Sequence, residues 1–208
     1  MKTFLKILPF FSFIFFVAFS SCENGLAFKK DLTFSDRIEE DLSLEKAKEL
    51  ANTVALSSEQ LKTWFPNEIG DFTRISFIHG KRDSNNFNSI SGKFTATRNP
   101  KKHIELNVID GASVEGTLFI LVFKAKFNDD FQEESSEGYA RSIQKGNLKA
   151  LVRYNSKLNT SELEYLLDER FYMQIKGKNT SPEELWDFMA DIKPDNLIAL
   201  EKPKVFRD

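Results

Sequence analysis

Residues 103–108 read His-Ile-Glu-Leu-Asn-Val, and this stretch decides the fold class. Ile104, Leu106 and Val108 occupy every second position, and polar residues occupy the positions between them. Successive side chains of a β-strand point to opposite faces of the sheet. The alternation therefore predicts a strand with one buried face and one hydrated face.

The same period of two recurs along the chain. Further strands are predicted at 73–79, 93–98, 139–143, 148–154 and 171–176. Residues 99–102 and 145–147 predict turns between neighbouring strands, because they are rich in Asn, Pro and Gly. Strands with one polar face are typical of a largely antiparallel sheet that is covered on one side.

An N-terminal helical segment is predicted over residues 36–64, as two helices. Ser57 and Gln60 form a capping-box pattern that starts the second helix. This helix is expected to end before Pro66, because proline disfavours the helical conformation in the residue before it.

Three later segments are also interpreted as helices. The firmest begins at Ser181-Pro182-Glu183-Glu184, which combines an N-cap, a proline at the first helical position and a following acid. Ser161 and Glu164 suggest a shorter helix that carries Leu163, Leu166 and Leu167. The stretch 113–127 suits either a helix or a strand, and we choose the helix. The chain is thus expected to form a single α+β domain, a largely antiparallel sheet with helices packed on one face, over residues 36–208, with the sheet and its helices in 72–208.

The first 22 residues differ from the rest of the chain. Lys2 and Lys6 precede an apolar run from Ile7 to Phe19, which ends in Ser20-Ser21-Cys22. A basic start, a short apolar core and small residues at the end are typical of an export signal. The run is too short to span a bilayer, which needs about 20 apolar residues. We expect residues 1–21 to be removed.

Phe19-Ser20-Ser21-Cys22 resembles the lipobox of bacterial lipoproteins, although that family prefers Leu where Phe19 stands. In that family the cysteine sulfur is acylated and the chain is cut just before it. The resemblance implies a protein of the cell envelope, lipid-anchored at Cys22 and located at the outer membrane facing the periplasm. Residues 22–35 then form a tether. Because Cys22 is the only cysteine, no thiol remains for a disulfide or a metal site.

The order of the predicted elements, with Asp110 closing one strand and Glu169-Arg170-Phe171 opening another, resembles uncharacterised envelope lipoprotein domains. It is loosely similar to the Mog1/PsbP-type fold. This resemblance covers about residues 60–200, rests on pattern alone and implies no activity.

Composition and motifs disfavour several functional classes. The chain has 29 Lys and Arg against 31 Asp and Glu, which disfavours general nucleic-acid binding. Its only histidines are His79 and His103, so no metal site is expected. No phosphate-binding or dinucleotide motif is present, and the sequence around Ser113 misses the spacing of a nucleophile elbow. We expect no cofactor, and interpret the acidic stretch 129–137 as a connecting loop in preference to a calcium site.

Basic residues gather between Arg74 and His103. A basic surface suits an anionic lipid or an acidic protein partner, and we select Arg82, Phe87, Arg98 and Lys101 as its candidate residues. The alternative is that these charges keep exposed strands hydrated and pair with the acidic segment that follows.

The sequence therefore favours a non-enzymatic, membrane-tethered domain that binds a partner or supports an assembly. The alternative is a carrier or sensor that holds a small apolar ligand between the sheet and its helices. An envelope hydrolase comes third, because no catalytic group stands out.

Overall fold

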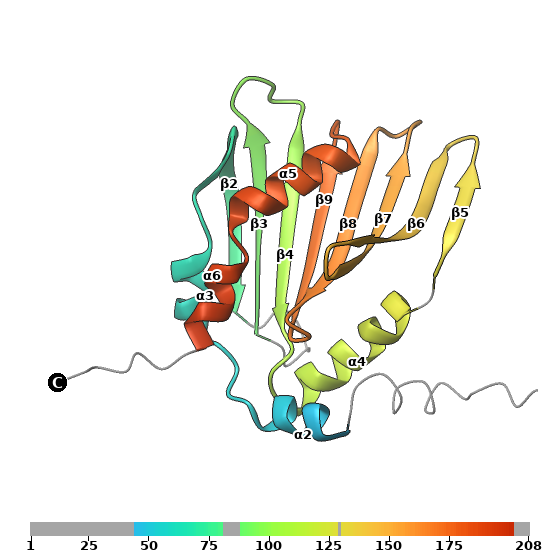
Figure 1. Cartoon of the computed structure of the whole chain (residues 1–208). Coiled ribbons are helices and arrows are strands. Elements are labelled where there is room, and N and C mark those ends of the chain that lie inside the picture. Colours follow the sequence, from blue (N-terminus) through green and yellow to red (C-terminus); the bar gives the residue numbers. More distant parts are fainter. Residues whose placement is uncertain (1–43, 81–87, 129, 202–208) are drawn as a thin grey trace, which may run out of the picture. The chain divides into compact units, whose positions relative to one another are not determined.

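The computed structural model describes residues 44–80, 88–128 and 130–201. The described residues form a nine-stranded sheet in the order β1-β2-β3-β4-β9-β8-β7-β6-β5 (Figure 1). All neighbouring strands are antiparallel. The expected α+β class, with its antiparallel sheet in a single domain, is confirmed.

The bounds of the elements are as follows. The strands are β1 (Glu68–Ile69), β2 (Phe72–Gly80), β3 (Ser89–Ala96), β4 (His103–Asp110), β5 (Gln132–Ser135), β6 (Gly138–Lys145), β7 (Leu148–Asn155), β8 (Thr160–Leu167) and β9 (Phe171–Lys178). The helices are α2 (Leu44–Asn52), α3 (Ser58–Trp64), α4 (Val114–Asn128), α5 (Pro182–Ile192), α6 (Asp195–Ile198) and the short 3-10 helix η1 (Ala199–Glu201).

The sheet consists of two meanders that meet at its centre. β1 to β4 follow one another along the chain and in space, and so do β5 to β9. The two halves are joined where β4 pairs with β9. Helix α4 carries the chain from the end of β4 to the far edge of the sheet at β5 (Figure 1).

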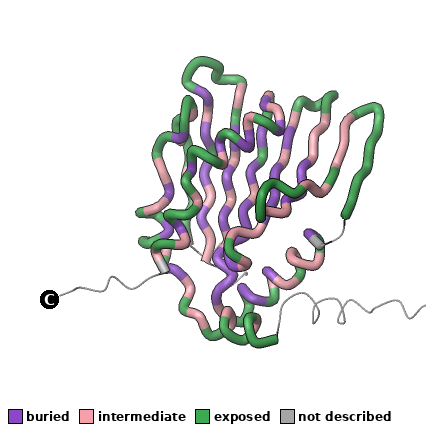
Figure 2. The backbone as a smooth tube through the Cα atoms, viewed as in Figure 1, coloured by how far each residue is buried: buried purple, intermediate pink, exposed green. Residues whose placement is uncertain are grey.

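One face of the sheet, here called the covered face, carries Ile104, Leu106 and Val108 of β4, all fully buried. In the register, Val108 lies opposite Ile90 of β3 and Met173 of β9, so the buried positions continue from strand to strand. The alternation of burial along the strands is visible in Figure 2. Helices α3, α5 and α6 complete this core with the side chains Leu61, Leu185, Phe188 and Leu197.

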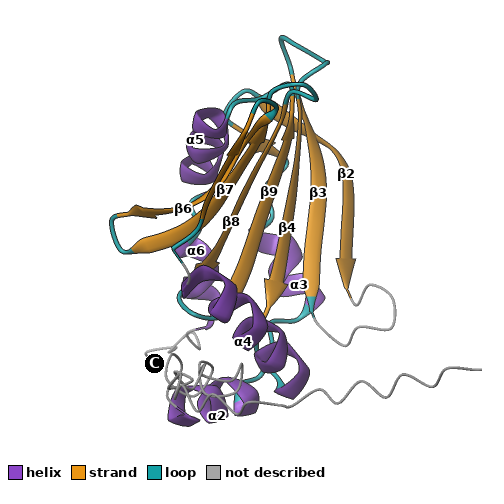
Figure 3. Ribbon diagram, turned by 90° about the vertical axis from the view of Figure 1, so that its right-hand side faces the viewer, coloured by secondary structure: helices purple, strands orange, loops and turns teal. Residues whose placement is uncertain are grey.

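The opposite face, here called the polar face, carries Glu105 and Asn107 of β4. Helix α4 packs on it and forms a second, smaller cluster, in which Ile120 and Phe127 meet Tyr172 of β9. The helix covers the end of the sheet where β4 ends and β9 begins (Figure 3). Helix α2 packs against α4. In this one respect the structure departs from the expected packing of helices on a single face.

Residues 161–167 were predicted as a short helix, and this prediction is wrong because they belong to β8. Ser161, Leu163 and Tyr165 are buried on the covered face, whereas Glu164 is buried on the polar face. The Ser-x-x-Glu spacing suggested a helix cap, but both side chains instead bond to other parts of the fold.

The acidic stretch was predicted as a connecting loop, and this is also wrong for Gln132–Ser135. These residues form β5, which pairs with β6 and is exposed along its whole length. The remaining predicted strands are present, and the stretch 113–127 is helical, as chosen. Both predicted capping boxes, at Ser57 and Ser181, are formed.

A buried ion pair holds the end of β4 to the start of β9. The Nε and Nη2 atoms of Arg170 lie 2.7 Å and 2.8 Å from the two carboxylate oxygens of Asp110. Asp110 also accepts hydrogen bonds from the backbone N–H of Leu56 at 2.7 Å and of Ala112 at 3.0 Å. The pair therefore ties the segment before α3 and the segment before α4 to the centre of the sheet.

Replacing Asp110 with Ala should lower the free energy of unfolding by about 3–5 kcal/mol, because it removes the carboxylate that balances the charge of the buried Arg170 guanidinium. Chemical denaturation measures the change. Asp71→Ala is the matched control: its carboxylate is half exposed, 4.0 Å from Arg98, and should matter by less than about 1 kcal/mol. Equal effects of the two substitutions would contradict a special role for the buried pair.

Candidate functional site

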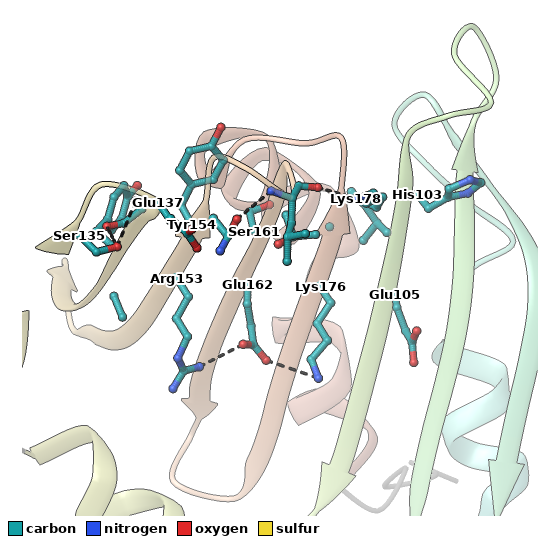
Figure 4. A pocket seen from close by; sticks show the side chains of 18 of the residues that line it. His103, Glu105, Ser135, Glu137, Arg153, Tyr154, Ser161, Glu162, Lys176 and Lys178 are labelled. Carbon is teal, nitrogen blue, oxygen red and sulfur yellow. Dashed lines mark hydrogen bonds and ion pairs between the residues drawn. The ribbon is translucent and has the colours of Figure 1, made fainter. Parts of the chain in front are cut away.

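A groove of about 880 Å³ opens on the polar face, beyond the area that α4 covers (Figure 4). Strands β3, β4, β9, β8, β7, β6 and β5 all contribute lining residues. We call it the polar groove. Ile75 of β2 and Leu158 of the β7–β8 turn add two exposed apolar side chains to its lining.

Charged side chains of alternating sign cross the groove in one row. In the register of the sheet, Lys93, Glu105, Lys176, Glu162 and Arg153 lie opposite one another on β3, β4, β9, β8 and β7. The charged atoms are 3.7 Å apart in Lys93–Glu105, 3.6 Å in Lys176–Glu162 and 3.1 Å in Arg153–Glu162. We call this row the charge ladder, and Figure 4 shows most of it.

The ladder follows from the strand pattern. Its members occupy the polar positions between the buried residues of five strands, so they all point to the same face. Each pair of opposite charges across neighbouring strands contributes about 0.2–1 kcal/mol to the stability of the sheet. Because most of these side chains are partly exposed, their main effect is to hold the charged groups in fixed places rather than to stabilise the fold.

The lining of the groove carries both signs in equal number. Four cationic side chains, Lys93, Arg153, Lys176 and Lys178, face four carboxylates, Glu105, Glu133, Glu137 and Glu162. A polyanion or a polycation therefore gains no net electrostatic attraction from these residues. The groove instead offers hydrogen-bond donors and acceptors side by side.

Glu164 of β8 is a buried carboxylate beside the ladder, with a side chain that is 3 % exposed. It accepts hydrogen bonds from Tyr172, from Lys126 at 2.9 Å and from Arg153. Burial alone raises the pKa of Glu164, but these three hydrogen bonds outweigh burial and hold the pKa below its ordinary value. Burial and the bond to Glu164 raise the pKa of Tyr172. Glu164 thus connects the ladder, through Arg153, to α4, through Lys126.

Two of the four residues selected from the sequence lie on the β3–β4 turn. Arg98 and Lys101 are exposed there, and the Nε atom of Arg98 is 4.0 Å from a carboxylate oxygen of Asp71. Neither residue lines the polar groove.

Arg82, Phe87 and the proposed lipidation residue Cys22 lie outside the described residues. Asn88, the first described residue after that stretch, lies at the start of β3, and Arg98 follows the end of the same strand. Arg98 and Lys101 on the turn are therefore at one end of β3, and Asn88, which follows the stretch of Arg82 and Phe87 in the sequence, is at the other end.

Other basic residues of the stretch from Arg74 to His103 pair within the fold. Arg74 is partly buried, lies 4.4 Å from the centre of the Phe77 ring and donates to the Phe65 carbonyl at 3.2 Å. Lys93 pairs with Glu105, as the alternative interpretation of the basic stretch expected.

The sequence did not single out Arg153, Glu162 and Lys176. Arg153 and Lys176 were on the polar sides of predicted strands, whereas Glu162 fell in the wrongly predicted helix. Their adjacency depends on the order β9-β8-β7, which alternation within single strands cannot reveal.

Among the described residues, no group of three or more His, Cys, Asp or Glu side chains could hold a metal ion. Ser113 caps α4, since its hydroxyl accepts from the Gly116 N–H at 3.3 Å. The space between the sheet and α5 is filled by buried side chains, among them Leu163, Ile175 and Leu185. No helix within the described ranges is both long and apolar enough to cross a membrane.

A comparison of the chain with protein-family models, with curated proteins and with solved structures finds no match. The polar groove is therefore interpreted from its own geometry.

Replacing Glu164 with Gln tests the bonds around this carboxylate. Because folding lowers its pKa, Glu164 stabilises the protein above the ordinary Glu pKa of about 4.3, and this contribution is lost as the pH falls through the lowered value. The variant should be less stable by about 1–3 kcal/mol near pH 7, and the difference should narrow in acid.

Urea denaturation at several pH values measures this difference. Glu133→Gln, at an exposed position of β5, is the control and should have little effect at any pH. A Glu164→Gln deficit that stays constant from neutral to acid pH would show that the carboxylate's charge is not the source of the stabilisation.

Proposed function

We propose that this protein is a lipid-anchored domain of the cell envelope that binds, without chemical turnover, an extended ligand of no net charge in the polar groove. The observation that carries the proposal is the charge ladder, which places fixed donors and acceptors along an open face of the sheet.

The size and rigidity of the groove support binding. Its volume of about 880 Å³ is within the range of roughly 300–1,000 Å³ found for ligand sites. The lining side chains stand on strands and are held by cross-strand ion pairs, so few rotamers must be frozen when a ligand binds.

The shape of the groove favours an extended ligand. Its lining comes from eight neighbouring strands, β2 to β5 in the order of the sheet, and the seven spacings of about 4.8 Å between them correspond to a length of up to about 34 Å. A single extended chain can follow such a row, meeting a donor and then an acceptor at successive strands. The balance of charges argues for a ligand that is neutral or carries both signs.

The pairing of the charged groups favours binding over catalysis. Glu105 and Glu162 each form an ion pair with a lysine or arginine, and the buried Glu164 accepts hydrogen bonds from several side chains. A general base or nucleophile needs an acceptor that is open to the substrate.

Replacing Lys93 and Lys176 together with Gln tests the groove. This variant should retain about a tenth or less of the ligand that the wild-type protein captures by mild cross-linking in its own envelope, because two ladder donors lose their charge. Its free energy of unfolding should change by less than about 1 kcal/mol per residue, since both side chains are more than half exposed.

Arg98→Gln with Lys101→Gln is the matched control, with two exposed cations outside the groove. Quantified cross-linked ligand is the readout for both variants. Loss of capture in the turn variant and retention in the groove variant would move the binding site to the basic turn selected from the sequence.

Replacing Cys22 with Ser tests the anchor. The lipobox resemblance of residues 19–22 leads us to expect an unprocessed or released protein, because the acylated sulfur is lost. Membrane fractionation and the mass of the mature N-terminus report the outcome. Normal membrane retention and a normal mature mass would show that Cys22 is not the anchor.

A further inference from the structure

Helix α4 exposes an apolar stripe. Val114, Leu118 and Val122 follow one another at intervals of four residues, and their exposed fractions are 61 %, 60 % and 52 %. Residues spaced by four lie on the same side of a helix. The inner side of α4 is also apolar, with Ile120 and Phe127 buried against the sheet. The outer stripe is therefore not needed for packing on the sheet.

Exposed apolar side chains concentrate at this end of the domain. Nine large hydrophobic residues are exposed among the described residues, and five of them belong to α2, to α4 or to the segment that directly follows α2. These five are Leu44, Val54, Val114, Leu118 and Val122. Single exposed apolar residues are ordinary, but a cluster of them marks a surface that contacts something.

We propose that the α4 stripe docks on the surface of the membrane that holds the lipid anchor, a proposal that rests on the anchor at Cys22. The described chain begins at Leu44 with α2, which packs against α4. Cys22 is 22 positions before Leu44, and a chain of that length spans at most about 75 Å. The segment that follows the proposed anchor thus joins the described domain at α2, next to α4, and its length lets the stripe reach the bilayer.

The size of the stripe favours a bilayer over a second copy of the chain. Three aliphatic side chains cover only a few hundred Å², whereas a stable protein interface buries about 800 Å² on each partner. A domain that is already tethered to a membrane needs much less, because the anchor supplies a high local concentration of bilayer surface.

The test uses the full chain with its anchor, reconstituted in phosphatidylcholine vesicles with and without brominated acyl chains. Leu118→Trp places a fluorophore in the stripe. Leu158→Trp is the matched control, a leucine with a similar exposed fraction of 56 % on the β7–β8 turn, at the end of the sheet away from α4 (Figure 1). The emission of Trp64 and Trp186 is measured in the wild-type chain and subtracted.

We expect the brominated lipid to quench the fluorophore at 118 by about half and that at 158 by less than a tenth. Val122→Trp repeats the measurement on the same stripe in case Leu118→Trp perturbs folding, which a thermal melt of each variant reports. Equal quenching at 118 and 158, in protein that floats with the vesicles, would overturn docking and leave the anchor intact.

Other outcomes separate the remaining possibilities. If the protein fails to float with the vesicles, the proposed anchor is wrong, and the docking that rests on it is wrong as well. If the emission of the tryptophan at position 118 shows that it is already buried from water before lipid is added, docking is also overturned. If that shielding depends on protein concentration, a second copy covers the stripe, and if it does not, another segment of the same chain covers it.

Discussion

The buried ion pair of Asp110 and Arg170 is the constraint on which the arrangement of the domain depends. It sits where the two meanders of the sheet meet, and its carboxylate also receives backbone N–H groups from the segments that lead into α3 and α4. Arg170 contributes its own carbonyl, which accepts from the Gly111 N–H at 3.0 Å. Because an isolated buried charge is very costly, both partners and both segments must be in place together. The Asp110–Arg170 pair thereby positions both α3 on the covered face and α4 on the polar face.

This junction also determines which part of the sheet stays open. A Cβ atom at Gly111 would lie 2.6 Å from the Arg170 carbonyl and would collide with Ile120, so only glycine allows the chain to turn directly from β4 into α4. The turn brings α4 onto the polar face at the end where β4 finishes, and Ile120 and Phe127 cover Tyr172 there. The rest of that face has no helix above it among the described residues, and charged side chains occupy it. Their mutual pairing lets a charged surface persist on a central part of the sheet without strong repulsion.

The sequence predicts elements well where their pattern is local. The alternation in β4 and the cap at Ser181 depend on residues within the same element, and the structure has both. β8 was mistaken for a helix because Ser161 and Glu164 have the spacing of a helix cap. In the structure Glu164 instead bonds to Lys126, Arg153 and Tyr172, which come from three other elements and are not visible in the local pattern. The charge ladder was missed for a similar reason. Each of its members looks like an ordinary exposed residue until the strand order places them in one row.

The two surfaces proposed to contact other molecules lie toward opposite ends of the strands. The α4 stripe is at the end where β4 finishes, and the groove lies toward the end that holds His103, the first residue of β4 (Figures 1 and 4). If Cys22 anchors the domain as proposed, a domain held to the membrane by the anchor alone would present its groove to the bilayer part of the time. The proposed second contact through α4 would restrict that rotation and turn the groove away from the membrane surface. In this proposal the stripe needs only enough apolar area to orient a domain that the proposed anchor already holds, so three aliphatic side chains would suffice.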